Sequence, residues 1–375
     1  MTTLSIHFPG KLVFGNGCLH QLPDEIAALA PGRLFIVTIT PLLPALHGLI
    51  HSLEKKGIHV VVYTGIVREP SFPDFHRIMA EATPFNPDLV IGMGGGSVLD
   101  IAKLVAAQLG NDQRLEDYVG IGLLKQRACK LICIPATSGT GSEVSPNAIL
   151  VDDADGQKKG IISPYLVPDL VLVDPLLTMS VPPDITAATG LDALTHCLEA
   201  YTNKFAQPFI DLYAFEGMRL IAANLVAAVR DGGDKTARSQ VAMGSLLGGF
   251  CLGPVNTAAV HALSYPLGSS FHLPHGLSNA LLLPYVMEFN LPAAPERYAG
   301  VARALGGTTP EDGVAKIRSL IRECGIPCTL KAVGIPYEAI ETMATEAMKI
   351  TRLLKNNPRP VTLQDVITIY KLAYE

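Results

Sequence analysis

The sequence has few charged residues, and it lacks features that define several classes of protein. Charged residues make up 17% of the 375 positions and hydrophobic residues 49%, a composition that excludes a disordered chain. The 29 basic and 34 acidic residues give a formal net charge of -5, and no basic run is dense enough to follow a phosphate backbone. We therefore expect no nucleic-acid partner.

Long apolar runs and a disulfide framework are also missing. No apolar stretch reaches the ~20 residues that span a bilayer, and the start of the chain lacks the blocks of a signal peptide, so we expect a cytoplasmic protein without a membrane contact. The seven cysteines are odd in number and scattered, which indicates reduced thiols. Cys324 and Cys328 could share a metal, but no second cysteine pair or nearby histidine completes a zinc site, so buried small side chains are favoured.

The periodicity of the apolar residues divides the chain into two parts. In the first part, β-branched runs alternate with helical stretches such as 42–57, the pattern of a parallel sheet covered by helices. After Val181, Pro182 and Pro183, long amphipathic stretches indicate a helical bundle. Because the chain exceeds the usual size of one core, we expect an α/β domain over residues 1–181 and an all-α domain over 182–375. The clearest predicted strands are 33–38, 59–65, 88–94, 130–137 and 169–175.

Two loops that follow predicted strands have the composition of phosphate-binding loops. Residues 94–97, Gly-Gly-Gly-Ser, precede a helix whose N-terminus adds roughly half a positive charge, and glycines let backbone N–H groups approach an anion. Ser97 departs from the dinucleotide fingerprint, and the loop follows a late strand. A tight turn without a ligand is the alternative. Residues 135–143, PATSGTGSE, form a second loop suited to a pyrophosphate or ribose.

One carboxylate and three imidazoles have the arrangement of a metal site. Asp192 and His196 are four residues apart, so on a helix they project from the same face. His261 and His275 follow, and the complete set suits Fe2+ or Zn2+ with room for a substrate oxygen. Each histidine alone would more often be a packed or surface residue, so the combination is what indicates a metal.

Together these motifs resemble those of the iron-containing (group III) alcohol dehydrogenase family, over nearly the whole chain. The segments GGGSVLDIAK, PATSGTGSEV, GLDALTHCLEAY, HALSYPLG and LPHGLSNALLLP occur in the family's order. The resemblance implies a Rossmann-like nucleotide-binding domain followed by a helical-bundle domain, the dehydroquinate synthase-like fold. It also implies a homodimeric oxidoreductase that uses NAD or NADP and a metal to interconvert a small alcohol and its aldehyde or ketone.

The resemblance further implies roles for individual residues. The implied metal ligands are Asp192, His196, His261 and His275. The implied nucleotide contacts are Gly94, Gly95, Gly96, Ser97, Asp100, Thr137, Ser138, Thr140 and Ser142. Asn147 falls where relatives line the nicotinamide and substrate pocket, and Lys158 falls near the nicotinamide ribose.

Two positions depart from the family's pattern. Many relatives have a histidine that relays protons at the position of Tyr265, so we expect Tyr265, the nearby His272 or solvent to take over that role. For His272, a solvated or structural histidine is an equal alternative. Ile39 stands where NAD-preferring relatives often have an acid that binds the ribose 2′-hydroxyl, so we expect cofactor choice to be relaxed or shifted toward NADP.

Other functions on the same fold are the alternatives. A dehydroquinate-synthase-like lyase also uses a metal and NAD, but those relatives bind the metal through a glutamate and two histidines. A hydroxyacid or oxoacid reductase and a maleylacetate-type reductase are closer alternatives. A non-catalytic nucleotide-binding protein is disfavoured because the four ligands and both loops are present.

Overall fold

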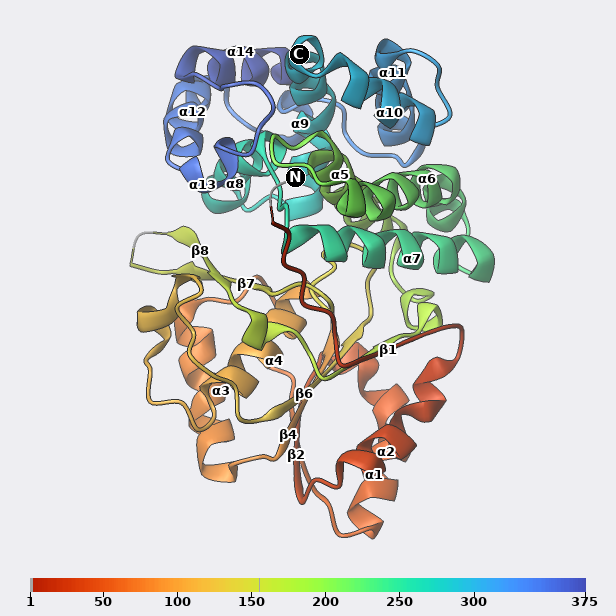
Figure 1. Cartoon of the computed structure of the whole chain (residues 1–375), viewed down its shortest axis with the longest axis vertical. Helices are drawn as coiled ribbons and strands as arrows, with labels where there is room; N and C mark the ends of the chain where they lie inside the picture. Colours follow the sequence, from red (N-terminus) through yellow and green to blue (C-terminus); the bar gives the residue numbers. More distant parts are fainter. Residues whose placement is uncertain (1–2, 155) are drawn as a thin grey trace. The chain divides into compact units, whose positions relative to one another are not determined.

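The structure is a computed structural model that describes residues 3–154 and 156–375. It contains two compact units (Figure 1). One unit comprises Ile6–Thr137 and Ser142–Thr178, and the other comprises residues 3–5, Ser138–Gly141 and Met179–Glu375. The short segment Ser138–Gly141 of the second glycine loop thus groups with the helical unit.

A parallel sheet forms the centre of the first unit, as the sequence predicted, and it has six strands. Its strand order is β1-β9-β6-β4-β2-β3, and every neighbouring pair is parallel. The edge strand β1 was not predicted, because four half-exposed residues carry no clear alternation. The strands are β1 (Lys11–Phe14), β2 (Arg33–Val37), β3 (His59–Tyr63), β4 (Leu89–Gly94), β6 (Lys130–Pro135) and β9 (Leu170–Val173).

Helices cover both faces of this sheet, which explains why most of its strands read as continuous apolar runs. Leu34 and Ile36 pack in one cluster with Leu46, whereas Phe35 faces the opposite way and lies 6.3 Å, ring to ring, from Phe85. Figure 1 shows α1 and α2 on one side of the sheet and α3 and α4 on the other. These helices are α1 (Leu22–Leu29), α2 (Leu43–Lys55), α3 (Phe72–Phe85) and α4 (Gly96–Gln108).

The strand order reverses between β2 and β4, so the sheet has a topological switch point there. In open parallel sheets, ligands bind at the carboxyl ends of the strands at such a point. Gly94 ends β4, and Thr38 directly follows β2. The Thr38 hydroxyl donates to the Met93 carbonyl at 2.8 Å and so ties the two strand ends together. Ile39 and the first glycine loop therefore lie at the edge where a nucleotide is expected.

A small three-stranded sheet, ordered β5-β8-β7, completes the first unit. Strands β7 and β8 form an antiparallel pair, and β5 adds to β8 in parallel. This sheet was not predicted, because β8 begins with the polar residues Gln-Lys-Lys and contains a glycine. The strands are β5 (Gly120–Ile121), β7 (Asn147–Asp152) and β8 (Gln157–Ile162).

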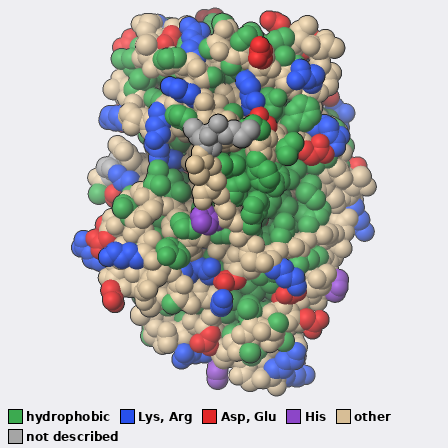
Figure 2. Space-filling model, viewed as in Figure 1, with side chains coloured by type: hydrophobic (Ala, Val, Ile, Leu, Met, Phe, Trp, Pro, Cys, Tyr) green, Lys and Arg blue, Asp and Glu red, His purple; other side chains and the backbone are tan. Residues whose placement is uncertain are grey.

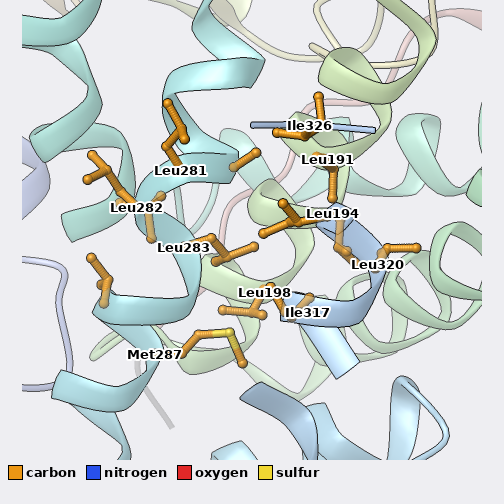
Figure 3. Packing of buried hydrophobic residues seen from close by; sticks show 14 of the residues in the cluster. Leu191, Leu194, Leu198, Leu281, Leu282, Leu283, Met287, Ile317, Leu320 and Ile326 are labelled. Atoms are coloured by element: carbon orange, nitrogen blue, oxygen red, sulfur yellow. The ribbon is translucent and has the colours of Figure 1, made fainter. Parts of the chain in front are cut away.

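The second unit is built from helices, which confirms the predicted all-α part. Leu191, Leu194 and Leu198 of α5 belong to one large hydrophobic cluster with residues of α9 and α11 (Figure 3). The helices are α5 (Pro183–Thr202), α6 (Pro208–Arg230), α7 (Lys235–Leu252), α8 (Ala259–Phe271), α9 (His275–Asn290), α10 (Pro295–Ala304), α11 (Pro310–Glu323), α12 (Ile340–Met348), α13 (Thr351–Leu354) and α14 (Leu363–Tyr374).

Helix α6 is the one helix in the described part of the chain that is long and apolar enough to cross a membrane. It carries the charged residues Asp211, Glu216 and Arg219. Its residues Met218 and Ile221 are fully buried in the hydrophobic cluster of the helical unit. A core helix passes the same length and composition test, so this helix gives little reason to expect a membrane span.

All seven cysteines are free thiols, as the sequence indicated. Six of them are buried, which agrees with their interpretation as small core side chains. Cys328 is the exception, because it lies exposed in the segment after α11. The interpretation as a buried side chain is therefore wrong for Cys328.

Candidate metal centre and cofactor loops

The predicted metal ligands come from three helices of the helical unit. Asp192 and His196 lie one turn apart on α5, His261 lies in α8, and His275 is the first residue of α9. The close approach of α9 to α5 has a local cause at Gly276, where an added Cβ would lie 2.1 Å from the Ala188 carbonyl oxygen. Only glycine lets the two backbones meet there, and this contact places His275 beside Asp192.

The four predicted ligands converge on one carboxylate oxygen. Asp192 Oδ1 lies 3.8 Å from His196 Nε2, 3.5 Å from His261 Nε2 and 3.7 Å from His275 Nε2. Donor atoms of Asp192, His261 and His275 all lie within 4.8 Å of one another, and His196 stacks on His261 beside this group. Two donors that bind one ion at ~2.1 Å with tetrahedral angles are ~3.4 Å apart, so the spacing of Asp192, His261 and His275 fits a divalent ion. His196 is not one of these three mutually close donors, although its Nε2 lies 3.8 Å from Asp192 Oδ1.

The electrostatics of the group are those of a buried anion surrounded by imidazoles. Burial alone would raise the pKa of Asp192, but the neighbouring histidines hold it well below its usual range. Burial lowers the pKa of His261, yet Glu199 and Asp192 outweigh it and raise that pKa to about 9. For His196 burial dominates, and its pKa is lowered. A cation is therefore favoured within this group.

Two further residues, neither of them predicted from the sequence, reach the group. Glu199 lies seven residues after Asp192 on α5, and one carboxylate oxygen is 2.6 Å from His261 Nδ1. Asn279 lies four residues after His275 on α9, and its amide donates to Asp192 Oδ1 at 2.7 Å. Both positions share a helix face with a predicted ligand, so helical spacing could have found them. The Asn279 side-chain oxygen is buried and has no hydrogen-bond partner among the described residues.

The first glycine loop joins β4 to α4, as predicted. A Cβ on Gly94 would lie 2.8 Å from Val98 Cβ, so glycine is needed there for the close packing of the helix on the strand. A Cβ on Gly95 would have ordinary contacts, the nearest being Thr137 Oγ1 at 3.5 Å. Packing therefore does not require a glycine at position 95. Gly96 and Ser97 form the first turn of α4.

In the second loop, glycines allow close packing of the backbone. A Cβ on Gly141 would lie 2.3 Å from Gly249 Cα, and Gly141 has a left-handed φ of +61°. A Cβ on Gly139 would lie 2.8 Å from Thr189 Cβ. These contacts hold residues Ser138–Gly141, which include Thr140, against α5 and α7. The glycines of this loop thus have a packing role that was not predicted from the sequence.

Asp100 and Ser142 bond to each other. Asp100 accepts from the Ser142 hydroxyl, and its other oxygen accepts from the Ile149 N–H at 2.9 Å. The fully buried Lys103, one turn further along α4, donates to the Asn147 carbonyl at 2.7 Å. These side chains fix Ser142 and the first half of β7 against α4. The predicted contacts of Asp100 and Ser142 with a nucleotide stay a prediction.

Glu143, the last residue of the second loop, is buried, with 3% of its surface exposed. Burial raises the pKa of its carboxyl to about 7, and a backbone hydrogen bond and Lys103 offset this only in part. Burial also lowers the pKa of Lys103. The loop therefore contains an acid that titrates near neutral pH.

Asn147 and Lys158 lie apart on the β7–β8 pair. Asn147 pairs with Ile162, whereas Lys158 pairs with Val151, four residues along the strand and so about 13 Å away. Lys158 Nζ lies 2.6 Å from a carboxylate oxygen of Glu69. The Asn147 side-chain oxygen is buried without a hydrogen-bond partner in the described part of the chain. The structure thus places the predicted pocket residue Asn147 and the predicted ribose contact Lys158 far apart along the pair.

The two candidates for the proton relay have different surroundings. The Tyr265 ring lies 6.1 Å, centre to centre, from the His275 ring. His272 is exposed and ends α8 in a left-handed conformation, with its N–H donating to the Gly268 carbonyl. His272 therefore has a structural role as a helix cap, while Tyr265 lies next to a predicted ligand. Which of them relays a proton stays a prediction.

Comparisons with known proteins agree with this geometry. Residues 9–175 match the family described as iron-containing alcohol dehydrogenase, and residues 186–374 match its C-terminal part. The chain is 40% identical to long-chain-alcohol dehydrogenase 1 of Geobacillus thermodenitrificans, over 100% of this chain and 98% of that protein.

Solved structures give the same result. A 1,3-propanediol oxidoreductase has a TM-score of 0.95 and 32% identity, with all of both chains covered. A sulfoacetaldehyde reductase from Bifidobacterium kashiwanohense, solved in complex with NAD+, has a TM-score of 0.91 and 28% identity, over 100% of this chain and 99% of that one. This chain therefore belongs to the iron-containing alcohol dehydrogenase family and is an oxidoreductase that interconverts an alcohol and its carbonyl compound.

Proposed function

We propose that Asp192, His196, His261 and His275 hold one divalent ion, with Fe2+ preferred and Zn2+ able to use the same ligands. The observation that carries this proposal is the convergence of three Nε2 atoms on Asp192 Oδ1 at 3.5–3.8 Å. When bound, the ion would polarise the oxygen of an alcohol or carbonyl substrate, and the nicotinamide would carry the hydride.

The residues of the chain have distinct tasks in this proposal. Asp192 and His261, each with a side chain 4% exposed, keep bulk water from the inner side of the site. His275 is 31% exposed, so the substrate approaches from its side. Tyr265 lies next to His275 and is the group that exchanges a proton with the substrate. His272 is the second candidate for that role.

For the cofactor, we propose NAD or NADP at the carboxyl ends of β2, β4 and β6. The switch point of the sheet and the space beside Gly95 support this location. The sulfoacetaldehyde reductase binds NAD+, but Ile39 of this chain provides no carboxylate to hold the ribose 2′-hydroxyl or to repel a 2′-phosphate. We therefore propose relaxed cofactor choice or a preference for NADP. The remaining proposed nucleotide contacts are Gly94, Gly96, Ser97, Asp100, Thr137, Ser138, Thr140, Ser142, Asn147 and Lys158.

The substrate is proposed to be a small alcohol or its aldehyde or ketone. The related proteins named above act on long-chain alcohols, 1,3-propanediol and sulfoacetaldehyde, so the family does not fix one compound. Steady-state turnover of NADH and NADPH with small aldehydes, dihydroxyacetone and keto acids is the test. Activity confined to keto acids would favour a hydroxyacid or oxoacid reductase, and no turnover with any of these compounds would contradict the proposed small substrate.

We also propose that the chain forms a homodimer in the cytoplasm. Strand β1 is an edge of the six-stranded sheet, and the nearby Phe8 and Leu12 are 48% and 38% exposed. Figure 2 shows a broad patch of hydrophobic side chains on one face of the molecule, and such patches often mark an interface. Sedimentation that finds only monomer at micromolar concentration would contradict the dimer.

The domain limits are proposed to be residues 1–181 and 182–375. Each part has its own hydrophobic cluster, which supports separate folding. Limited proteolysis with cleavage near Pro182, giving two resistant fragments, is the expected result. Cleavage that degrades both parts together would contradict these limits.

A further inference from the structure

Glu199 has two hydrogen-bond partners at the metal centre, and both come from α8. One of its oxygens accepts from the Val260 N–H at 2.6 Å, and the other lies 2.6 Å from His261 Nδ1. The side chain is 3% exposed, so these bonds are shielded from water. Each oxygen of the carboxylate thus has one hydrogen-bond partner, one at the N-terminus of α8 and the other on a predicted metal ligand.

These contacts determine which nitrogen of His261 carries the proton in the neutral ring. A carboxylate oxygen accepts hydrogen bonds, so His261 Nδ1 must be the donor. The lone pair then lies on Nε2, the atom that is 3.5 Å from Asp192 Oδ1. The neutral ring in this tautomer binds a metal through Nε2 without a change in its orientation.

We propose that Glu199 is a positioning residue for the metal centre: it fixes the proton on His261 Nδ1, aims Nε2 at the ion and supplies the second buried negative charge. This inference rests on the metal site proposed above. Asp192 and Glu199 are both buried, and together they balance the charge of one divalent ion when the three histidines are neutral. A balanced charge matters because a buried, uncompensated ion is unfavourable.

A purely structural role is the competing explanation. The bond to the Val260 N–H lies in the first turn of α8, and the residue before this helix, Ala258, makes no side-chain cap. A carboxylate at a helix N-terminus stabilises the helix in any case. If this were its whole role, Glu199 would affect the stability of the fold and leave metal affinity unchanged.

The substitution Glu199→Gln separates the two roles. The glutamine oxygen still accepts from the Val260 N–H and so preserves the cap. Its amide NH2 group then faces His261 Nδ1 and donates to it, which moves the ring proton to Nε2 and blocks that atom for a metal. A matched control is Glu216→Gln, which removes one negative charge from the exposed part of α6, where Glu216 pairs with Arg219.

The experiment measures Zn2+ affinity of the metal-stripped full-length chain in competition with a chromophoric chelator. We expect the parent and Glu216→Gln to bind equally, and Glu199→Gln to bind about 10- to 100-fold more weakly. Thermal unfolding of the metal-free proteins should give the same midpoint within a few degrees. Unchanged zinc affinity of Glu199→Gln would overturn the inference and leave only the helix cap.

Two further measurements keep the outcomes distinct. His275→Ala is titrated with zinc in parallel. If His275→Ala loses zinc affinity and Glu199→Gln keeps it, this inference alone is overturned. If both variants keep zinc affinity, the proposed metal site itself is overturned. Imidazole 15N NMR spectra of the zinc-loaded parent need no variant, so they test the inference even if Glu199→Gln fails to fold. They should show a proton on His261 Nδ1, and a proton-free Nδ1 would refute the proposal.

Discussion

A His275→Ala variant is expected to lose the metal and the turnover while it keeps the fold. His275 suits this test because its side chain is 31% exposed, whereas those of Asp192 and His261 are 4% exposed. Removal of His261 would leave the Glu199 carboxylate buried beside an empty space, and the resulting loss of stability would obscure the loss of metal. Position 275 begins α9, where alanine is well tolerated.

The expected magnitudes follow from these surroundings. When one of the four donors is lost, the remaining three are too few to hold an ion in competition with water. Without the ion that polarises the substrate oxygen, the activation free energy should rise by about 4 kcal/mol or more. At 1.36 kcal/mol per factor of ten, turnover should fall about 1000-fold or more. Truncation of a partly exposed side chain should lower the free energy of unfolding by about 1 kcal/mol, which corresponds to about 2–4 °C in Tm.

The assay combines three measurements on the same preparations. Plasma mass spectrometry gives the metal content, nicotinamide absorbance gives kcat/KM for alcohol oxidation, and thermal unfolding of metal-free protein reports on the fold. The control His76→Ala removes an exposed histidine from α3 and should leave all three values unchanged. Metal-free His275→Ala with turnover within tenfold of the parent would mean that this group of residues is not the catalytic centre.

Three further predictions concern the α/β unit. Ile39→Asp should shift the ratio of kcat/KM toward NAD by about 100-fold, or about 2.7 kcal/mol, and a ratio within threefold of the parent would show that other contacts decide cofactor choice. Gly95→Ala should leave the free energy of unfolding unchanged but raise the KM for the cofactor at least about tenfold. Gly94→Ala should lower the free energy of unfolding by about 2 kcal/mol, because the added methyl group would overlap Val98. An unchanged cofactor KM in Gly95→Ala would favour a tight turn that binds no nucleotide. Burial raises the pKa of Glu143 from 4.5 to about 7, so between these pH values the folded state binds more protons than the unfolded state, and the free energy of unfolding falls by about 3 kcal/mol as the pH rises. In urea unfolding of metal-free protein, Glu143→Gln should therefore be more stable than the parent at pH 8 but not at pH 4. Equal stability of the two proteins at pH 8 would refute this prediction.

Local sequence patterns were sufficient for the main architecture. Buried parallel strands have continuous apolar runs because helices cover both faces, so β2, β4 and β6 were predicted within two residues of their observed limits. The helical part was likewise evident from its periodicity. The edge strand β1 and the β7–β8 pair were missed, because partly exposed strands with polar residues and a glycine carry little local signal.

The sequence by itself determined the types of residue at the site, and for Asp192 and His196 their relative placement, because helical spacing is a local property. Only the tertiary structure decided that His261 and His275 meet this pair, since that depends on the contact of the α9 and α5 backbones at Gly276. It also decided that Glu199 bonds to His261 across two helices. Such contacts join residues more than 60 positions apart, and no periodicity within one segment encodes which distant segment will pack against it.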